Sequence, residues 1–272
     1  MRGKQSQRQS TTNPSMPEAD DKARAVWQAV LVDGYEPLRR AQRIFRHLPS
    51  GPRCKLCHNP FGGVGGKLVG VVGFKPSRKN PNLCARCCDK LPAGGLELDV
   101  AVLFADVRGS TSLGERMDAA SFADLLNRFY AMATEVLVRH DAIIDKLVGD
   151  EVMALFVPGI AGTAYRRQAA MAATELMEAL AGGLSLPVGA AVHAGRAFMG
   201  NVGVGHVVDL TAVGDPVNTA ARLQAEAAAG EVVLSDDVYA EVSDRFPDAE
   251  CRTVSIRGRE APIGVHVVRL PV

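Results

Sequence analysis

The spacing of hydrophobic residues changes along the chain, and the change separates two kinds of predicted structure. Between residues 22 and 48, apolar side chains return every three or four positions with one break at Asp33-Gly34, which predicts two helical pieces. Farther along, the unbroken apolar run 100–104 predicts a buried strand. Apolar positions spaced from Phe122 to Leu137 then predict a long amphipathic helix, with Ser121 as its N-cap.

Shorter apolar runs continue this pattern to the end of the chain. Strands and helices alternate there without a sustained βαβ rhythm, so we expect an α+β sandwich of the ferredoxin-like kind with a largely antiparallel sheet. Further strands are predicted at 143–148, 152–157 and 188–193, on both sides of Gly203, and at 232–234, 254–256 and 265–270; further helices are predicted at 162–181 and 216–229.

Local composition divides the chain into four segments. Residues 1–21 are polar and predict a disordered tail, and residues 22–49 form the helical segment. Residues 50–95 are rich in Gly, Pro and Cys, with too few large apolar side chains to fold without a cross-link or a metal. Residues 96–272 form the main folded domain, and Pro92-Ala-Gly-Gly95 at the border predicts a hinge.

Overall composition excludes several classes of protein. The chain has 272 residues, of which 47% are hydrophobic and 22% charged, so it is not a wholly disordered protein. No run approaches the ~18 consecutive apolar residues of a membrane span, and the first 21 residues contain no apolar core of a secretory signal. We therefore expect a cytoplasmic protein.

The net charge of +1 conceals two segments of opposite sign. Residues 37–90 contain twelve Lys or Arg and one acid, whereas residues 91–272 contain 14 basic and 24 acidic side chains. Such a basic segment is typical of contact with nucleic acid or an anionic membrane. Docking on the chain's own acidic domain explains both signs at once, so this is the favoured interpretation.

Four cysteines in the basic segment have the spacing of a metal site. Cys54-x-x-Cys57 and Cys84-x-x-Cys87 offer four thiolates, which match a tetrahedral Zn²⁺ site. The adjacent Cys88 leaves an iron–sulfur cluster with a redox-sensing role as an alternative.

Two other residues bear on the interpretation of the cysteines. Cys54-Lys-Leu-Cys57-His58 also fits a c-type haem attachment pattern, but the absence of an export signal and the second cysteine pair speak against haem. His58 is interpreted as a turn or surface residue. The sixth cysteine, Cys251, is expected to be an ordinary packing residue.

Three segments after residue 96 place polar residues where the apolar pattern predicts strand ends or a helix face. An Asp at the end of a buried strand and a following Gly-Ser-Thr turn suit a hard cation beside a phosphate. Taken singly, each segment also has an ordinary structural explanation, as a turn cap, a hairpin turn or a solvated helix face. The three segments are Phe104–Thr111, Asp145–Phe156 and Thr211–Leu223.

Together these segments resemble the catalytic domain of class III nucleotidyl cyclases, in particular the bacterial-type homodimeric adenylate cyclases. The motifs are FADVRGST, DKLVGDEVMALF, VHAGRAFMGNVG and TAVGDPVNTAAR, and the resemblance covers roughly residues 96–270. It implies a cyclase-type α+β sandwich over 96–272, and the cysteine pairs before it are interpreted as a metal-binding regulatory module. It also implies formation of a 3′,5′-cyclic nucleotide and pyrophosphate by two-metal-ion catalysis.

The resemblance assigns a role to each polar position. Asp106, the backbone of Val107 and Asp150 would hold two Mg²⁺ or Mn²⁺ ions, and Asn218 and Arg222 would orient the ribose and offset charge on the α-phosphate. Four more positions would bind the phosphates of the substrate: Gly109, Ser110, Thr111 and, near the C-terminus, Arg257.

By the same resemblance, Lys146 and Thr211 choose the base. A Lys only donates hydrogen bonds, which suits N1 of adenine, and a hydroxyl can accept from the exocyclic amine of adenine. ATP is therefore favoured over GTP. Many members of the family have Asp where this chain has Thr211, and a neutral hydroxyl discriminates less sharply, so a guanylate cyclase remains an alternative.

In this family the site lies at a dimer interface, so a head-to-tail homodimer with two sites is expected. A rival interpretation is a catalytically silent cyclase-like domain attached to a basic, zinc-stabilised module that binds nucleic acid. The presence of Asp106, Asp150, Asn218 and Arg222 speaks against it, because a silent relative would be expected to lose one of these residues.

Overall fold

The computed structural model describes residues 17–33, 52–57, 59–70, 75–77, 80–184, 186–204, 207–256 and 261–270. The predictions for residues 1–16 and for the second helical piece after Asp33, and the assignments of His58 and Arg257, lie outside the described residues.

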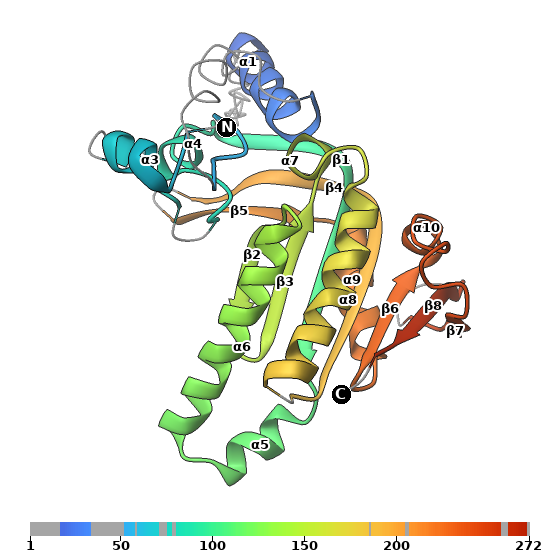
Figure 1. The fold of residues 1–272 in the computed structure, drawn as a ribbon. Helices are drawn as coiled ribbons and strands as arrows, with labels where there is room; N and C mark the ends of the chain where they lie inside the picture. Colours follow the sequence, from blue (N-terminus) through green and yellow to red (C-terminus); the bar gives the residue numbers. More distant parts are fainter. Residues whose placement is uncertain are drawn as a thin grey trace, which may run out of the picture.

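The described residues contain one eight-stranded sheet, with the order β2-β3-β1-β4-β6-β8-β7 and β5 paired to β4 (Figure 1). Every neighbouring pair is antiparallel except β4 and β6. The predicted α+β fold with a largely antiparallel sheet is confirmed. The strands are β1 (Gly94–Val107), β2 (Ile143–Val148), β3 (Glu151–Phe156), β4 (Val188–Val204), β5 (Val207–Val213), β6 (Glu231–Ser235), β7 (Glu250–Val254) and β8 (Ile263–Arg269).

Two long helices, α6 (Ala119–Arg139) and α8 (Tyr165–Gly183), pack side by side over one face of the sheet (Figure 1). Their apolar stripes bury Phe129 and Leu176 completely against β1, β3 and β4. Truncating a fully buried Phe to Ala costs about 3–5 kcal/mol, so this layer supplies much of the stability. The predicted N-cap Ser121 is wrong: the Asp118 carboxylate accepts from the N–H groups of Ala120 and Ser121, and the helix begins at Ala119.

The opposite face carries α9 (Asp215–Ala225), α1 (Pro17–Gln28), the π-helical turn η1 (Ala29–Asp33) and the cysteine segment, which we define as residues 52–90. Trp27 of α1 and Leu83 of the cysteine segment are buried in one apolar cluster with residues of β1 and β3. Since α1 begins at Pro17, residues 17–21 are helical rather than part of a disordered tail.

One prediction about the edge of the sheet is wrong. Cys251, on β7, is exposed instead of packed, and its Sγ lies 3.4 Å from Nδ1 of His266 on the neighbouring strand. No helix in the described parts of the chain combines the length and the apolar character that a bilayer crossing requires.

Short helices connect the layers of the fold. They are α3 (Gly63–Gly70), α4 (Ala85–Cys88), α5 (Ser110–Arg116), α7 (Pro158–Ala161) and α10 (Asp236–Tyr239).

The hinge predicted at 92–95 is also wrong, because β1 begins there. Gly94 and Gly95 pair with Asn201 and Gly200 of β4. The two strands approach so closely that a Cβ on Gly95 would lie 2.3 Å from the carbonyl oxygen of Met199, so only glycine fits at this crossing. The Asn201 side chain also donates to the carbonyl of Pro92 at 2.9 Å, which fixes the chain just before the strand.

A buried ion pair ties the far side of the sheet together. Glu231 of β6 accepts from both terminal nitrogens of Arg252 of β7, at 2.6 and 2.9 Å, and from the N–H of Ala228. These contacts lower the pKa of Glu231 from 4.5 to about 2, with the Arg252 hydrogen bonds as the main cause. A lowered pKa stabilises the folded state above pH 4.5, and this stabilisation is lost as the pH falls towards 2.

We predict that Glu231→Gln lowers the free energy of unfolding at pH 7 by about 1–3 kcal/mol. It should also flatten the dependence of stability on pH between 4.5 and 2, as urea denaturation at several pH values would measure. Glu97→Gln is the control, because Glu97 and its partner Arg196 are 3.8 Å apart and both 73% exposed, where an ion pair contributes little. Equal effects of the two substitutions would contradict the prediction.

Candidate active site and cysteine cluster

Three acidic residues lie near one another where β1 ends beside the β2–β3 turn. Asp106 is paired across the strands with Glu151, and the Asp150 carbonyl accepts from the N–H of Val107 at 3.3 Å. Burial, together with the hydrogen bond and the charge of Asp150, raises the pKa of Asp106, and burial beside the same two acids raises the pKa of Glu151. Crowded carboxylates of this kind repel one another and are stabilised by a bound cation.

The backbone after Asp106 turns directly into a helix. Arg108 donates to Oδ2 of Asp106 at 2.8 Å and balances part of its charge. Gly109 has φ +70°, a conformation that glycine adopts readily, and it precedes the first turn of α5, which begins with Ser110 and Thr111. The backbone N–H groups of this turn therefore lie within a few residues of the acids.

A second polar group lies on β2 and β5. Nζ of Lys146 is 3.5 Å from Oγ1 of Thr211, so the structure brings these two predicted residues together. Behind them, the buried Asp145 accepts a 2.8 Å hydrogen bond from the Thr211 hydroxyl and lies 3.8 Å from the Lys146 ammonium. We call Asp145, Lys146 and Thr211 the base-side cluster.

The third group lies on α9. Asn218 and Arg222 are four residues apart and both exposed, so they present a polar pair on one face of this helix. The other face buries Thr219, Ala220 and Leu223 against the sheet. Pro216 in the first turn and Gly214 before it start the helix abruptly after β5.

The structure thus groups the predicted site residues into the acids with α5, Lys146 with Thr211, and Asn218 with Arg222. Sequence reasoning missed three side chains that contact these groups: Asp145, Arg108 and Glu151. The alternation of β3 could have indicated Glu151, which stands opposite a predicted metal ligand. Asp145 carried no such signal, because its contact with Thr211 joins residues 66 positions apart.

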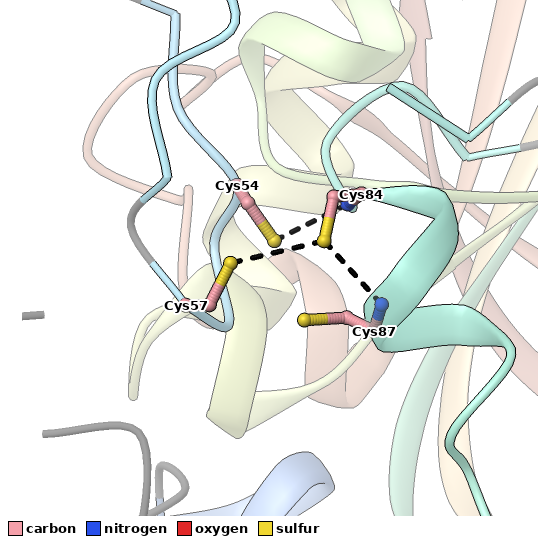
Figure 2. A group of neighbouring side chains, drawn as sticks. All are labelled: Cys54, Cys57, Cys84 and Cys87. Atoms are coloured by element: carbon pink, nitrogen blue, oxygen red, sulfur yellow. Dashed lines mark hydrogen bonds between the residues drawn. The ribbon is translucent and has the colours of Figure 1, made fainter. Parts of the chain in front are cut away.

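The cysteine segment brings four sulfur atoms together (Figure 2). Sγ of Cys54, Cys57, Cys84 and Cys87 all lie within 4.8 Å of one another, and the Cys57–Cys84 separation is 3.8 Å. The hydrogen bond with Cys57 lowers the pKa of Cys54, whereas the hydrogen bond with Cys54 raises the pKa of Cys87. Four thiols so close compete for protons, which is the behaviour of a group arranged for a cation.

Comparisons with known proteins agree with this geometry. The family model described as "Adenylate and Guanylate cyclase catalytic domain" matches residues 97–268, which is more than half of the chain. The chain belongs to this family. Its cyclase domain therefore contains the acids, the base-side cluster and α9.

Solved cyclases share the fold of this domain. The adenylyl cyclase CyaB from P. aeruginosa superposes with a TM-score of 0.58 at 27% identity, over 64% of this chain and 96% of that one. The guanylyl cyclase Cya2 gives a TM-score of 0.59 at 24% identity, over 64% of this chain and 93% of that one. Similarity therefore extends to proteins named for either nucleotide.

Curated relatives extend beyond the cyclase domain. An uncharacterized protein of Mycobacterium tuberculosis is 33% identical over 246 residues, which is 88% of this chain and 43% of that protein. A second one from the same organism is 31% identical over 86% of this chain and 40% of its own length. The chain thus spans less than half of these relatives, yet an alignment of that length necessarily includes the cysteine segment.

The cysteine segment contacts the cyclase domain at the turn between α6 and β2. Nδ2 of Asn82 donates to the carbonyls of Val138 and Ala142, both at 3.1 Å. Lys55 forms a 2.6 Å ion pair with Asp141, which has φ +63°. Apolar side chains of the segment, among them Leu56 and Leu83, are buried in the same cluster as residues of β1 and β3, so the contact combines this ion pair with apolar packing.

We predict that Cys84→Ser removes the metal that we expect on the four cysteines. Cys84 is fully buried, and its sulfur also accepts from the N–H of Cys87 at 3.3 Å. Metal content measured by elemental analysis should fall from about one ion per chain to near zero. The melting temperature should fall by roughly 10 °C, because a structural metal contributes several kcal/mol to folding.

Cys251→Ser is the matched control, because this thiol is exposed on β7, whereas the four cysteines pack in the apolar cluster with β1 and β3. It should leave metal content and melting temperature unchanged. Full metal content in the Cys84→Ser protein would show that the four sulfurs are not one site.

Proposed function

We propose that the chain is an adenylate cyclase that converts ATP to 3′,5′-cyclic AMP and pyrophosphate at a homodimer interface, with a metal-binding regulatory module before the catalytic domain. The observation that carries the proposal is the coexistence, in a domain of the cyclase family, of the acid cluster with a Lys146–Thr211 pair suited to adenine. In the reaction the ribose 3′ oxygen attacks the α-phosphorus, and the bond to the bridging oxygen of the β-phosphate breaks.

Asp106 and Asp150 are the residues that would hold the divalent cations, with the backbone carbonyl of Val107 as a further oxygen ligand. Carboxylate and carbonyl oxygens are the ligands that Mg²⁺ and Mn²⁺ prefer, and burial together with the neighbouring Asp150 raises the pKa of Asp106, which a bound cation would oppose. Bound there, two such cations would activate the ribose hydroxyl and neutralise the triphosphate. Arg108 would give up part of its contact with Asp106 to them.

The remaining residues bind and orient the nucleotide. The N–H groups of Gly109, Ser110 and Thr111 would hold phosphate oxygens at the start of α5, and Arg257 is proposed as a further phosphate contact. Asn218 would orient the ribose. Arg222, whose guanidinium presents several donors in a rigid plane, would offset the charge that develops on the α-phosphate.

Adenine is favoured by the donors and acceptors of the base-side cluster. The Lys146 ammonium can only donate, which suits the unprotonated N1 of adenine and opposes the N1–H of guanine. The Thr211 hydroxyl can accept from the exocyclic amine. The neutral hydroxyl and the structural likeness to a guanylyl cyclase keep GTP as the second candidate substrate.

Exposed apolar side chains support the homodimer. Val148 at the end of β2, Val204 on the β4–β5 hairpin and Val213 on β5 are 61%, 87% and 51% exposed. Val148 comes two residues before Asp150 and Val213 two residues after Thr211, so two of these side chains lie next to predicted site residues in the chain. Large exposed aliphatic side chains are typical of a protein interface. A head-to-tail pair would cover them and let one subunit supply the acids while its partner supplies the base-side cluster and α9.

The four cysteines are proposed to hold Zn²⁺. A tetrahedron of sulfurs around Zn²⁺ with bonds of 2.3 Å has edges of about 3.8 Å, which the Cys57–Cys84 separation matches. An iron–sulfur cluster spreads its cysteines over several irons and bridging sulfides, so it needs a wider arrangement than four sulfurs within 4.8 Å. Cysteine thiols stay reduced in the cytoplasm, so a cluster of four metal-binding thiols supports a cytoplasmic location.

The test of the proposed activity is incubation of the purified protein with Mn²⁺ and either ATP or GTP, followed by chromatography of the products. We expect cyclic AMP with an equal amount of pyrophosphate, and a higher kcat/KM for ATP than for GTP. If a folded dimer forms no cyclic product from either nucleotide, the proposal fails in favour of a silent cyclase-like domain carrying a basic module for nucleic acid.

The shared site predicts complementation between two inactive variants. Asp106→Ala and Arg222→Ala should each be inactive alone, since each homodimer lacks one essential group at both sites. Mixed in equal amounts, half of the dimers are mixed and each has one intact site, so about a quarter of the wild-type activity should return. Sedimentation must show that both variants still dimerise; no recovery in dimerising mixtures would contradict the shared site.

A further inference from the structure

The Thr211 hydroxyl is held from behind by a buried carboxylate. Its oxygen lies 2.8 Å from Oδ2 of Asp145, with the hydroxyl as donor, and both residues are at most 5% exposed. This is an ordinary O–H···O hydrogen-bond distance. The two residues come from β2 and β5, which are not neighbours in the sheet order, so the contact depends on the fold.

A hydroxyl has one hydrogen, so its direction decides what the oxygen offers to a ligand. When the hydrogen points at Asp145, the remaining lone pairs of Thr211 can only accept. A carboxylate forces this direction because it has no hydrogen of its own to donate. The Lys146 ammonium lies 3.8 Å from the same carboxylate oxygen.

We propose that Asp145 is a positioning residue for base selection: it fixes Thr211 as an acceptor and thereby selects the donating exocyclic amine of adenine against the accepting 6-oxo group of guanine. The inference rests on the proposed cyclase activity and adds a residue to its specificity. Asp145 acts through Thr211, because the threonine side chain lies between it and the base.

The same carboxylate also holds Lys146 beside Thr211. Nζ of Lys146 is 3.5 Å from the threonine oxygen and 3.8 Å from the carboxylate. One buried charge therefore arranges both groups that face the base, one as a pure donor and the other as a pure acceptor. Adenine has the complementary pair, an accepting N1 beside a donating amine, whereas guanine presents the reverse.

The first experiment compares kcat/KM for ATP and GTP in Asp145→Asn and in the wild type. An amide can donate to Thr211, which frees the hydroxyl to donate to the 6-oxo group of guanine. We expect the ATP-to-GTP ratio to fall about tenfold, the usual scale for one hydrogen bond reversed. Asp124→Asn is the matched control: the same change on the exposed side of α6, expected to leave the ratio within twofold.

A second genetic background, Thr211→Val, distinguishes the proposed positioning role of Asp145 from a purely structural role. In Thr211→Val there is no hydroxyl to orient, so adding Asp145→Asn should cause no further change in the ATP-to-GTP ratio. A general loss of packing would lower activity equally in both backgrounds. If Asp145→Asn leaves the ratio unchanged in the wild-type background while Thr211→Val lowers it, the inference is overturned.

A third measurement uses the unmodified protein, so it does not depend on the folding of any variant. Purine riboside triphosphate keeps the N1 acceptor of ATP but lacks the exocyclic amine. If Thr211 is fixed as an acceptor for that amine, kcat/KM should fall about tenfold relative to ATP. Equal use of both nucleotides would overturn the inference, whereas failure to cyclise any nucleotide would instead overturn the proposed function.

Discussion

The pairing of β1 with β4 is the interaction on which the rest of the structure depends. It runs without a break from Gly94 opposite Asn201 to Val107 opposite Val188. At its C-terminal end, β1 places Asp106 beside the acidic residues of the β2–β3 turn. At its N-terminal end, Gly95 of β1 lies in close contact with Gly200 of β4. β4 in turn carries β5 and its Thr211. A shift of register by one residue would send the acids to the opposite face of the sheet.

The contact between the cysteine segment and the α6–β2 turn connects the four cysteines physically with the strand that carries Lys146. Asn82 and Lys55, each within two residues of a cysteine of the cluster, are joined by a 2.9 Å backbone hydrogen bond. Both hold the turn at 138–142, where Asp141 adopts a left-handed conformation that costs a non-glycine residue about 1 kcal/mol or more. Lys146 follows this turn by a few residues on β2. If the four cysteines hold a metal as proposed, its removal would loosen this contact and, through the turn, the start of β2, the strand that carries Asp145 and Lys146.

Local signals in the sequence were sufficient where a residue acts within its own segment. The apolar run before Asp106, the Gly-Asp turn at Asp150 and the two cysteine pairs all lie where the spacing predicts. The errors have tertiary causes. The glycines at 94–95 predict a hinge, because the sequence does not reveal that β4 lies directly against them. Cys251 is predicted to pack, because the sequence does not reveal that its strand, β7, is the last strand of the sheet and leaves the thiol exposed. At the start of α6, Asp118 and Ser121 are both good capping residues, and only the backbone shows which one accepts.

The base-side cluster shows why the choice between Asp and Thr at one position does not by itself define a specificity. At the position where many members of the family have Asp, this chain has the Thr211 hydroxyl, which donates to the buried carboxylate of Asp145. A neutral hydroxyl alone can donate or accept and would discriminate weakly between a 6-amino and a 6-oxo group. Backed by Asp145 it loses that freedom, and it accepts as a carboxylate would without placing a negative charge directly against the base. The Lys146 ammonium, 3.8 Å from the Asp145 carboxylate, offsets part of this charge within the cluster.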